Sequence, residues 1–149
     1  MGLKEQIPED IKTALRNKST LELSVLRMLQ SALKNKEIDK NKEELTDDDV
    51  ISVVGAEIKK RRDAVNEFEK VNRQDAADQE KAEIEVLMKY MPQQMSEDEI
   101  RSLVNKTVEE TGAESMKDIG ILMKVLMPQV KGKADGSVVN RIVREILDK

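Results

Sequence analysis

Hydrophobic residues recur every three or four positions along almost the whole chain, which is the spacing of one face of an α-helix. No stretch alternates regularly between hydrophobic and polar residues in the way that a half-buried β-strand requires. Glycine, proline and short polar runs divide the pattern into about seven segments. The sequence therefore predicts an all-α protein.

The first half of the chain has recognisable helix starts. Ser19 and Glu22 have the spacing of a capping box, and they are predicted to start the second helix. Thr46 is predicted to cap a long third helix, and the polar run at residues 72–75 separates it from a fourth. The first predicted helix runs to about Arg16, and its buried face carries Ile7, Ile11, Ala14 and Leu15.

A second change of pattern predicts a domain boundary. The residue before Pro92 avoids helical backbone, and Ser96 with Glu99 forms another capping-box pair directly afterwards. We therefore expect an N-terminal helical bundle over residues 1–93 and a small C-terminal helical domain over residues 94–149.

Three shorter helices are expected in the C-terminal domain. The first is predicted to stop at Gly112 and the second at Pro128. The third has a hydrophobic face made of Val138, Val139, Ile142, Val143, Ile146 and Leu147.

Composition excludes several kinds of chemistry. The chain has no cysteine and no histidine, which removes disulfides, thiol nucleophiles, most zinc sites and the commonest general base at neutral pH. The acidic run at residues 47–49 resembles a metal cluster, but acidic residues in the first turn of a helix complement its dipole. No nucleophile–base pair or nucleotide-binding glycine motif is present. We therefore expect no catalytic residue, no metal site and no cofactor.

Charge and hydrophobicity restrict the possible partners. The net charge of −4 argues against a protein that coats nucleic acid, so any RNA site must be local. One phenylalanine and one tyrosine are too few to stack bases, so RNA backbone and shape would be recognised. The first residues lack an apolar signal core, and no stretch approaches the roughly 20 apolar residues of a membrane span. We expect a cytoplasmic protein that does not contact a membrane.

The segment at residues 131–136, KGKADG, places lysines and glycines against a predicted helix start. The first N–H groups of a helix lack intrahelical partners and carry the positive end of its dipole, so such a loop can hold a phosphate. A structural interpretation is also open, in which Gly132 ends one helix and Asp135 caps the next. The candidate RNA-binding residues are Lys131, Gly132, Lys133, Arg141 and Arg144.

A second basic cluster lies in the long third helix. Its candidate residues are Lys59, Lys60 and Arg62. Four consecutive basic residues of a helix, residues 59–62, point around the cylinder and cannot all face one partner. The alternative is that the lysines are solvated and one arginine pairs with a carboxylate such as Asp63 or Glu57.

Several short motifs follow one another in a fixed order along nearly the whole chain. They are residues 23–29 (LSVLRML) with Glu37 and Ile38, residues 57–64 (EIKKRRDA), residues 73–75 (RQD), residues 90–92 (YMP), Gly120 with Met123, and residues 131–136 (KGKADG). Together they resemble the YqeY family of small bacterial and organellar proteins. Two positions depart from the family pattern: Ile121 stands where a lysine is frequent, and Ala76 where a leucine is usual.

The resemblance implies two helical domains, the second related to the tail of GatB, the tRNA-binding subunit of the glutamine-dependent amidotransferase. It implies no catalysis, because the ATP-dependent chemistry of that enzyme belongs to a larger domain without a counterpart in these 149 residues. The missing lysine at Ile121 removes one candidate phosphate contact.

Three functions are consistent with these observations. The first is a non-catalytic module that binds tRNA or another structured RNA through the KGKADG segment. The second is an adaptor that binds another protein and no RNA, through its methionine-bearing helices or residues 59–62. The third is an accessory factor of an amidotransferase, whose carbon–nitrogen ligase activity with glutamine as amido donor would reach this chain by family label alone.

Overall fold

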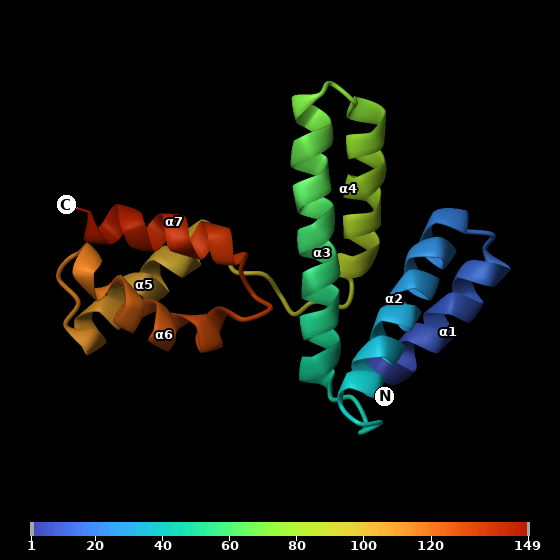
Figure 1. Cartoon of the computed structure of the whole chain (residues 1–149), viewed down its shortest axis with the longest axis horizontal. Coiled ribbons are helices and arrows are strands. Elements are labelled where there is room, and N and C mark those ends of the chain that lie inside the picture. Colours follow the sequence, from blue (N-terminus) through green and yellow to red (C-terminus); the bar gives the residue numbers. More distant parts are fainter. Residues whose placement is uncertain (1, 149) are drawn as a thin grey trace. The chain divides into compact units, whose positions relative to one another are not determined.

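The computed structural model describes residues 2–148, and the regular structure in that range is entirely helical (Figure 1). This confirms the predicted all-α fold. The elements are α1 (Leu3–Arg16), α2 (Thr20–Asp39), α3 (Asp47–Lys70), α4 (Gln74–Met88), α5 (Glu97–Thr111), the 3-10 turn η1 (Met116–Asp118), α6 (Ile119–Val130) and α7 (Gly136–Leu147).

The chain divides into two compact units between Met91 and Pro92. Each unit has its own hydrophobic core, and the buried members of the two cores lie on opposite sides of this division. The boundary expected after residue 93 is two residues further along the chain. That each unit folds without the other remains a prediction.

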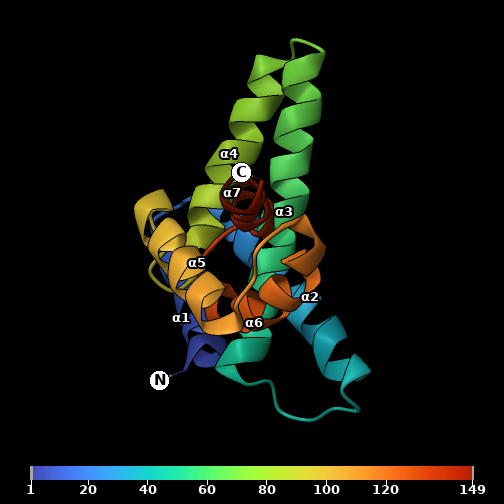
Figure 2. The same ribbon diagram turned by 90° about the vertical axis from the view of Figure 1, so that its left-hand side faces the viewer.

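The N-terminal unit consists of two helical hairpins, α1 with α2 and α3 with α4 (Figures 1 and 2). The tip of the α3–α4 hairpin extends past the ends of α1 and α2, and Arg73 there stacks 5.6 Å from the centre of the Phe68 ring. The hairpins enclose a core that includes Ile7, Leu26, Leu29, Val50, Val54, Leu87 and Tyr90.

The helix starts of this unit agree only partly with the sequence prediction. At Thr46 the predicted cap forms, since its hydroxyl accepts a 3.1 Å hydrogen bond from the Asp49 N–H. The capping box predicted at Ser19 is wrong: α2 begins there, but the Ser19 side chain makes no capping hydrogen bond. The Glu22 carboxylate, which a capping box would need, instead accepts a 2.7 Å hydrogen bond from Lys89. It therefore forms an ion pair with a residue far away in the sequence.

One predicted core position of α1 is also wrong. Leu15 leaves 50% of its surface exposed, whereas Ile7 and Ala14 are buried. The helix turns by about 100° per residue. Burial of Ala14 therefore carries its neighbour away from the core.

The C-terminal unit packs α5, α6 and α7 around a second core. Ser96 and Glu99 form the predicted capping box, and Gly112 ends α5 with a left-handed φ of 73°. The predicted stop at Pro128 is wrong, because α6 continues to Val130. A proline so near the end of a helix deprives a single carbonyl of its donor, so the last turn still forms.

No helix within residues 2–148 is both long enough and apolar enough to cross a bilayer.

Candidate nucleic-acid interface

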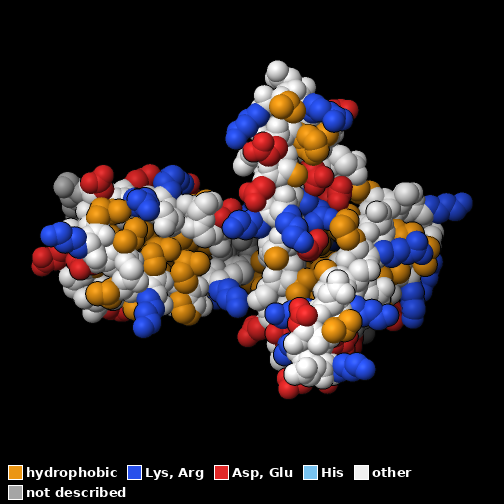
Figure 3. Space-filling view, in the orientation of Figure 1, with side chains coloured by type: hydrophobic (Ala, Val, Ile, Leu, Met, Phe, Trp, Pro, Cys, Tyr) orange, Lys and Arg blue, Asp and Glu red, His pale blue; other side chains and the backbone are white. Residues whose placement is uncertain are grey.

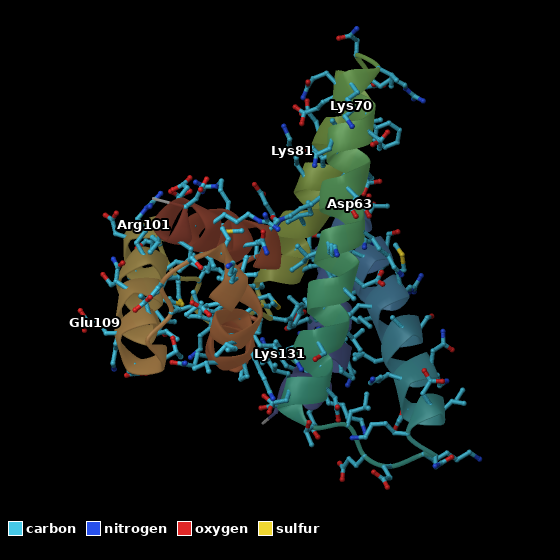
Figure 4. All side chains as sticks on the ribbon, turned by 60° about the vertical axis from the view of Figure 1, so that its left-hand side comes forward. Asp63, Lys70, Lys81, Arg101, Glu109 and Lys131 are labelled. Carbon is cyan, nitrogen blue, oxygen red and sulfur yellow. The ribbon has the colours of Figure 1, made fainter. Side chains whose placement is uncertain are left out.

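The loop between α6 and α7 is a tight turn that brings two lysines to the surface. Gly132 has a φ of 77°, in the left-handed region that glycine adopts without steric cost. The N–H groups of Lys133 and Ala134 both donate to the carbonyl of Val130, at 2.8 and 3.0 Å. Because Val130 is fully buried, the turn is anchored to the core, while Lys131 (labelled in Figure 4) and Lys133 are exposed.

A segment far away in the sequence fixes the same loop from outside. The Gln94 side-chain amide donates to the Gly132 carbonyl at 2.8 Å, and the Met95 N–H donates to the Lys133 carbonyl at 2.9 Å. These bonds hold the backbone that carries the lysines. Sequence reasoning did not find Gln94 and Met95, since no local motif connects residues 38 positions apart.

The N-terminus of α7 is capped by the chain itself. The Asp135 carboxylate accepts from both the N–H and the hydroxyl of Ser137, each at 2.9 Å. The structural interpretation of Gly132 and Asp135 is therefore confirmed. A phosphate at this helix start would meet a carboxylate, so any anion contact falls to the lysine side chains and not to the Ser137 N–H.

The two lysines carry charge that the fold leaves uncompensated. Neither Lys131 nor Lys133 forms an ion pair with a carboxylate in the part of the chain that the structure describes. A lysine head of this kind is a flexible point charge suited to phosphate groups.

The two candidate arginines of α7 differ in their surroundings, although both are exposed. Arg141 pairs with Glu97 and, at 3.1 Å, with Glu145, which also binds Arg101 at 2.5 Å where α5 meets α7 (Figure 4). Glu97 and Glu145 raise the pKa of Arg141, and Arg101 and Arg141 lower the pKa of Glu145. The positive charge of Arg141 is thus balanced within the unit.

Arg144 is the other α7 candidate. Its Nε donates to the Asn140 side-chain oxygen at 2.7 Å, and among residues 2–148 it has no carboxylate partner. Both arginines lie on α7, the helix that follows the lysine loop. Arg144 keeps an uncompensated positive charge there, whereas the charge of Arg141 is balanced by glutamates.

The second basic cluster, in α3, is mainly structural. Arg61 is buried and binds Glu57 and Glu83, each at 3.2 Å, while its Nη2 lies 3.3 Å from the Met28 sulfur. Lys60 donates to Glu57 at 3.1 Å. Burial opposes the ionisation of Glu57, but Lys60 and Arg61 outweigh it and hold its pKa below the usual range.

This arrangement agrees with the alternative that the sequence left open, in which one arginine pairs with Glu57. Of the predicted patch, Lys59 and Lys60 are exposed and Arg62 is half-buried. The glutamate partner from α4, Glu83, could not be foreseen because it depends on the pairing of two helices.

The acidic residues at the start of α3 are also in structural use. Asp47 accepts from the Leu3 N–H at 3.0 Å, and Asp49 binds Thr46 and Lys40. Within residues 2–148 no group of acidic side chains is arranged to hold a metal ion.

The fold and this loop define a two-unit helical protein with a basic turn between its last two helices. The chain belongs to the YqeY-like family, whose pattern, described as Yqey-like protein, matches residues 4–147. The resemblance predicted from the sequence motifs is thereby confirmed.

Relatives from fungi match most of the chain. A protein named "Altered inheritance of mitochondria protein 41, mitochondrial" from Pyrenophora tritici-repentis is 27% identical over 146 residues, which covers 95% of this chain and 79% of the relative. Its namesake from Lachancea thermotolerans is 34% identical over 106 residues, or 70% of this chain and 57% of the relative. Because these names place the relatives in mitochondria, the cytoplasmic location stays a prediction.

A third relative supports the predicted link to the amidotransferase. It is one component of the glutamyl-tRNA(Gln) amidotransferase of Methanobrevibacter smithii, and it is 46% identical over 50 residues, which is 34% of this chain but 8% of the relative. The similarity therefore reaches only a small part of that enzyme component.

Proposed function

We propose that the chain is a non-catalytic accessory module that binds tRNA, or RNA of similar fold, through Lys131, Lys133 and Arg144. The observation that carries this proposal is a lysine loop whose backbone is held by Val130, Gln94 and Met95 while its charges lack carboxylate partners among the described residues. Fixing the backbone lowers the entropy that binding would cost.

The local charge supports an anionic partner. From Lys117 onwards the sequence has seven basic and four acidic residues, although the whole chain has a net charge of −4. Arg141 is neutralised by two glutamates, so about three cations are available to phosphates. Contacts of this kind position an RNA without reading its bases, which suits a module that assists another protein.

One of the relatives also supports a role connected with tRNA. The matching amidotransferase component is named for glutamyl-tRNA(Gln), and the part that matches this chain is a small fraction of its length. The absence of histidine and cysteine from this sequence is consistent with a binding role, because the commonest acid–base and nucleophilic side chains are missing.

The test measures binding of the full chain to unfractionated tRNA by fluorescence anisotropy over a series of salt concentrations. Three phosphate contacts give a log–log salt slope of roughly −2, using about −0.7 per contact as for single strands. The double variant Lys131→Glu/Lys133→Glu should bind about tenfold more weakly or worse, with a slope closer to zero.

A matched control is Lys117→Glu/Lys124→Glu, which removes the same charge from two exposed lysines elsewhere in the C-terminal unit. This variant should keep most of the affinity. Equal losses of tRNA affinity in both double variants would indicate that only the net charge of the unit matters and that the loop is not a specific binding site. Absence of binding by the unmodified chain at low salt would refute RNA binding.

A further inference from the structure

Helix α6 is apolar on both of its sides. Leu122, Leu126 and Val130 are fully buried in the core of the C-terminal unit. On the opposite side, Ile121 leaves 61% of its surface exposed and Val125 leaves 37%. Only two of its twelve residues, Lys124 and Gln129, have polar side chains.

The exposed apolar residues form one continuous stripe. Ile121, Val125 and Pro128 are four and three positions apart, so they follow one another along the outer side of the helix. Met127 of the same helix is also 37% exposed. In the C-terminal unit, Figure 3 shows hydrophobic side chains gathered in the region of α6 with lysine or arginine around them.

The other two helices of the unit are built differently. The outer side of α5 carries Asn105, Lys106 and Glu109, and that of α7 carries Arg141 and Arg144. These faces are suited to water, whereas a helix that is hydrophobic all round is normally covered on both sides. The outer face of α6 therefore has the composition of an interface.

Gly120 gives a second, independent indication. A Cβ added to this helical residue would meet no atom within 4 Å, so the fold itself has no steric need for glycine there. Glycine in a helix costs about 1 kcal/mol relative to alanine. An exposed glycine on this helix would let the backbone of a partner approach closely.

The charges around the stripe indicate the chemistry of its occupant. Lys117 and Lys124 are exposed and have no carboxylate partner among residues 2–148, and α6 contains no acidic residue. A second copy packed α6 against α6 would place like charges together. Nucleic acid would leave the apolar stripe unpaired.

We infer that the outer face of α6 binds an amphipathic helix of another protein, whose apolar stripe is flanked by aspartate or glutamate. The stripe of Ile121, Val125 and Pro128 meets the apolar side of that helix, and Lys117 and Lys124 meet its acidic flanks. The mode is a helix laid along a hydrophobic surface, with charge fixing its orientation. This surface does not include Lys131, Lys133 or Arg144, so its test is separate from that of RNA binding.

The experiment places a photoreactive amino acid at position 121 of the full chain in cells of its source organism and identifies the cross-linked segment by mass spectrometry. The same probe at Asn105, exposed on α5, is the control. We expect a segment from another protein with apolar residues three and four apart and acidic flanks, absent with the Asn105 probe. A synthetic peptide of that segment should bind the unmodified chain.

Charge variants complete the test. Lys117→Glu/Lys124→Glu should reduce both the cross-link and peptide binding at least severalfold, while Lys59→Glu/Lys106→Glu, with the same charge change at exposed residues, should leave them unchanged. The inference is overturned by a cross-link to this chain, to RNA, to lipid or to a segment without acidic flanks. It is equally overturned if position 121 captures no more than position 105.

Discussion

The two units of the chain differ in whether they bury charged residues. In the N-terminal unit, Arg61 and Glu57 are buried and form part of the packing between α3 and α4. In the C-terminal unit Thr107 is the one buried polar side chain among the described residues, and its hydroxyl donates to a carbonyl of its own helix. The ion pairs of Arg141 lie at the surface of that unit.

This difference separates the charges that the fold uses from those that it leaves available to a ligand. Charges that hold a fold together cannot be given up to a ligand without loss of stability. Charges that the fold leaves uncompensated, such as those of Lys131 and Lys133, are available to a partner without that loss. The basic cluster of α3 and the basic loop of the C-terminal unit look alike in the sequence, but in the cluster Arg61 and Lys60 pair with glutamates, whereas Lys131 and Lys133 in the loop have no such partner among the described residues.

The largest expected effect is a loss of stability confined to the C-terminal unit. Leu126 is fully buried, and Leu126→Ala should lower the free energy of unfolding by about 4 kcal/mol, through lost burial and the cavity left behind. Urea unfolding followed by circular dichroism reports both units, whereas fluorescence of Tyr90, the single tyrosine, reports the N-terminal one. Independent units predict an unchanged Tyr90 transition; a shifted one would show that the units are coupled.

The second effect is a loss of stability of the N-terminal unit when its buried ion pairs are removed. Arg61→Leu leaves Glu57 and Glu83 without their buried partner and should cost about 3 kcal/mol, the lower end for such pairs because Lys60 still binds Glu57. The Tyr90 transition should move to lower urea. Lys59→Leu, at an exposed neighbour, should stay within about 0.5 kcal/mol of the unmodified chain. Equal stability of Arg61→Leu and the original would mean that the cluster is dispensable.

A smaller effect distinguishes two glycines of the C-terminal unit. Gly112→Ala should destabilise it by about 1 kcal/mol, because alanine is strained at a φ of 73°. Gly120→Ala should stabilise it by about 0.5–1 kcal/mol, because the position is helical and has room for a methyl group. Thermal melting of the two variants compares them directly. If Gly120→Ala destabilises the unit, the site is not open as described.

The smallest effect concerns pH in the N-terminal unit. The hydrogen bonds from Lys40 and Thr46 hold the pKa of Asp49 at about 2, below the value near 3.9 of an unfolded chain. The unfolded state therefore takes up its proton first, and this contribution to stability is lost as the pH falls from about 4 to 2. Asp49→Asn should flatten the pH dependence of the Tyr90 transition in that range. An unaltered profile would assign the acid sensitivity to other carboxylates.

Local pattern was sufficient for most of the helices. Capping by Thr46 and by Ser96, and the stop at Gly112, depend on residues within a few positions of one another, and all three were predictable. The failures at Ser19 and Pro128 have different causes. The carboxylate of Glu22, which the capping box required, pairs with the distant Lys89. Pro128 lies two residues before the end of α6, where it removes only one helical donor, so the helix continues to Val130.

The sequence by itself determined the helical class of the fold, its family and the position of the basic loop, because helical periodicity, motif order and a glycine-rich turn are all written in neighbouring residues. Tertiary structure alone decided which charges are compensated. Arg61 meets Glu83 only when α3 pairs with α4, Arg141 meets Glu97 only when α7 packs on α5, and Gln94 reaches Gly132 across 38 residues. Electrostatic balance and burial depend on distances in space, which spacing along the chain does not encode.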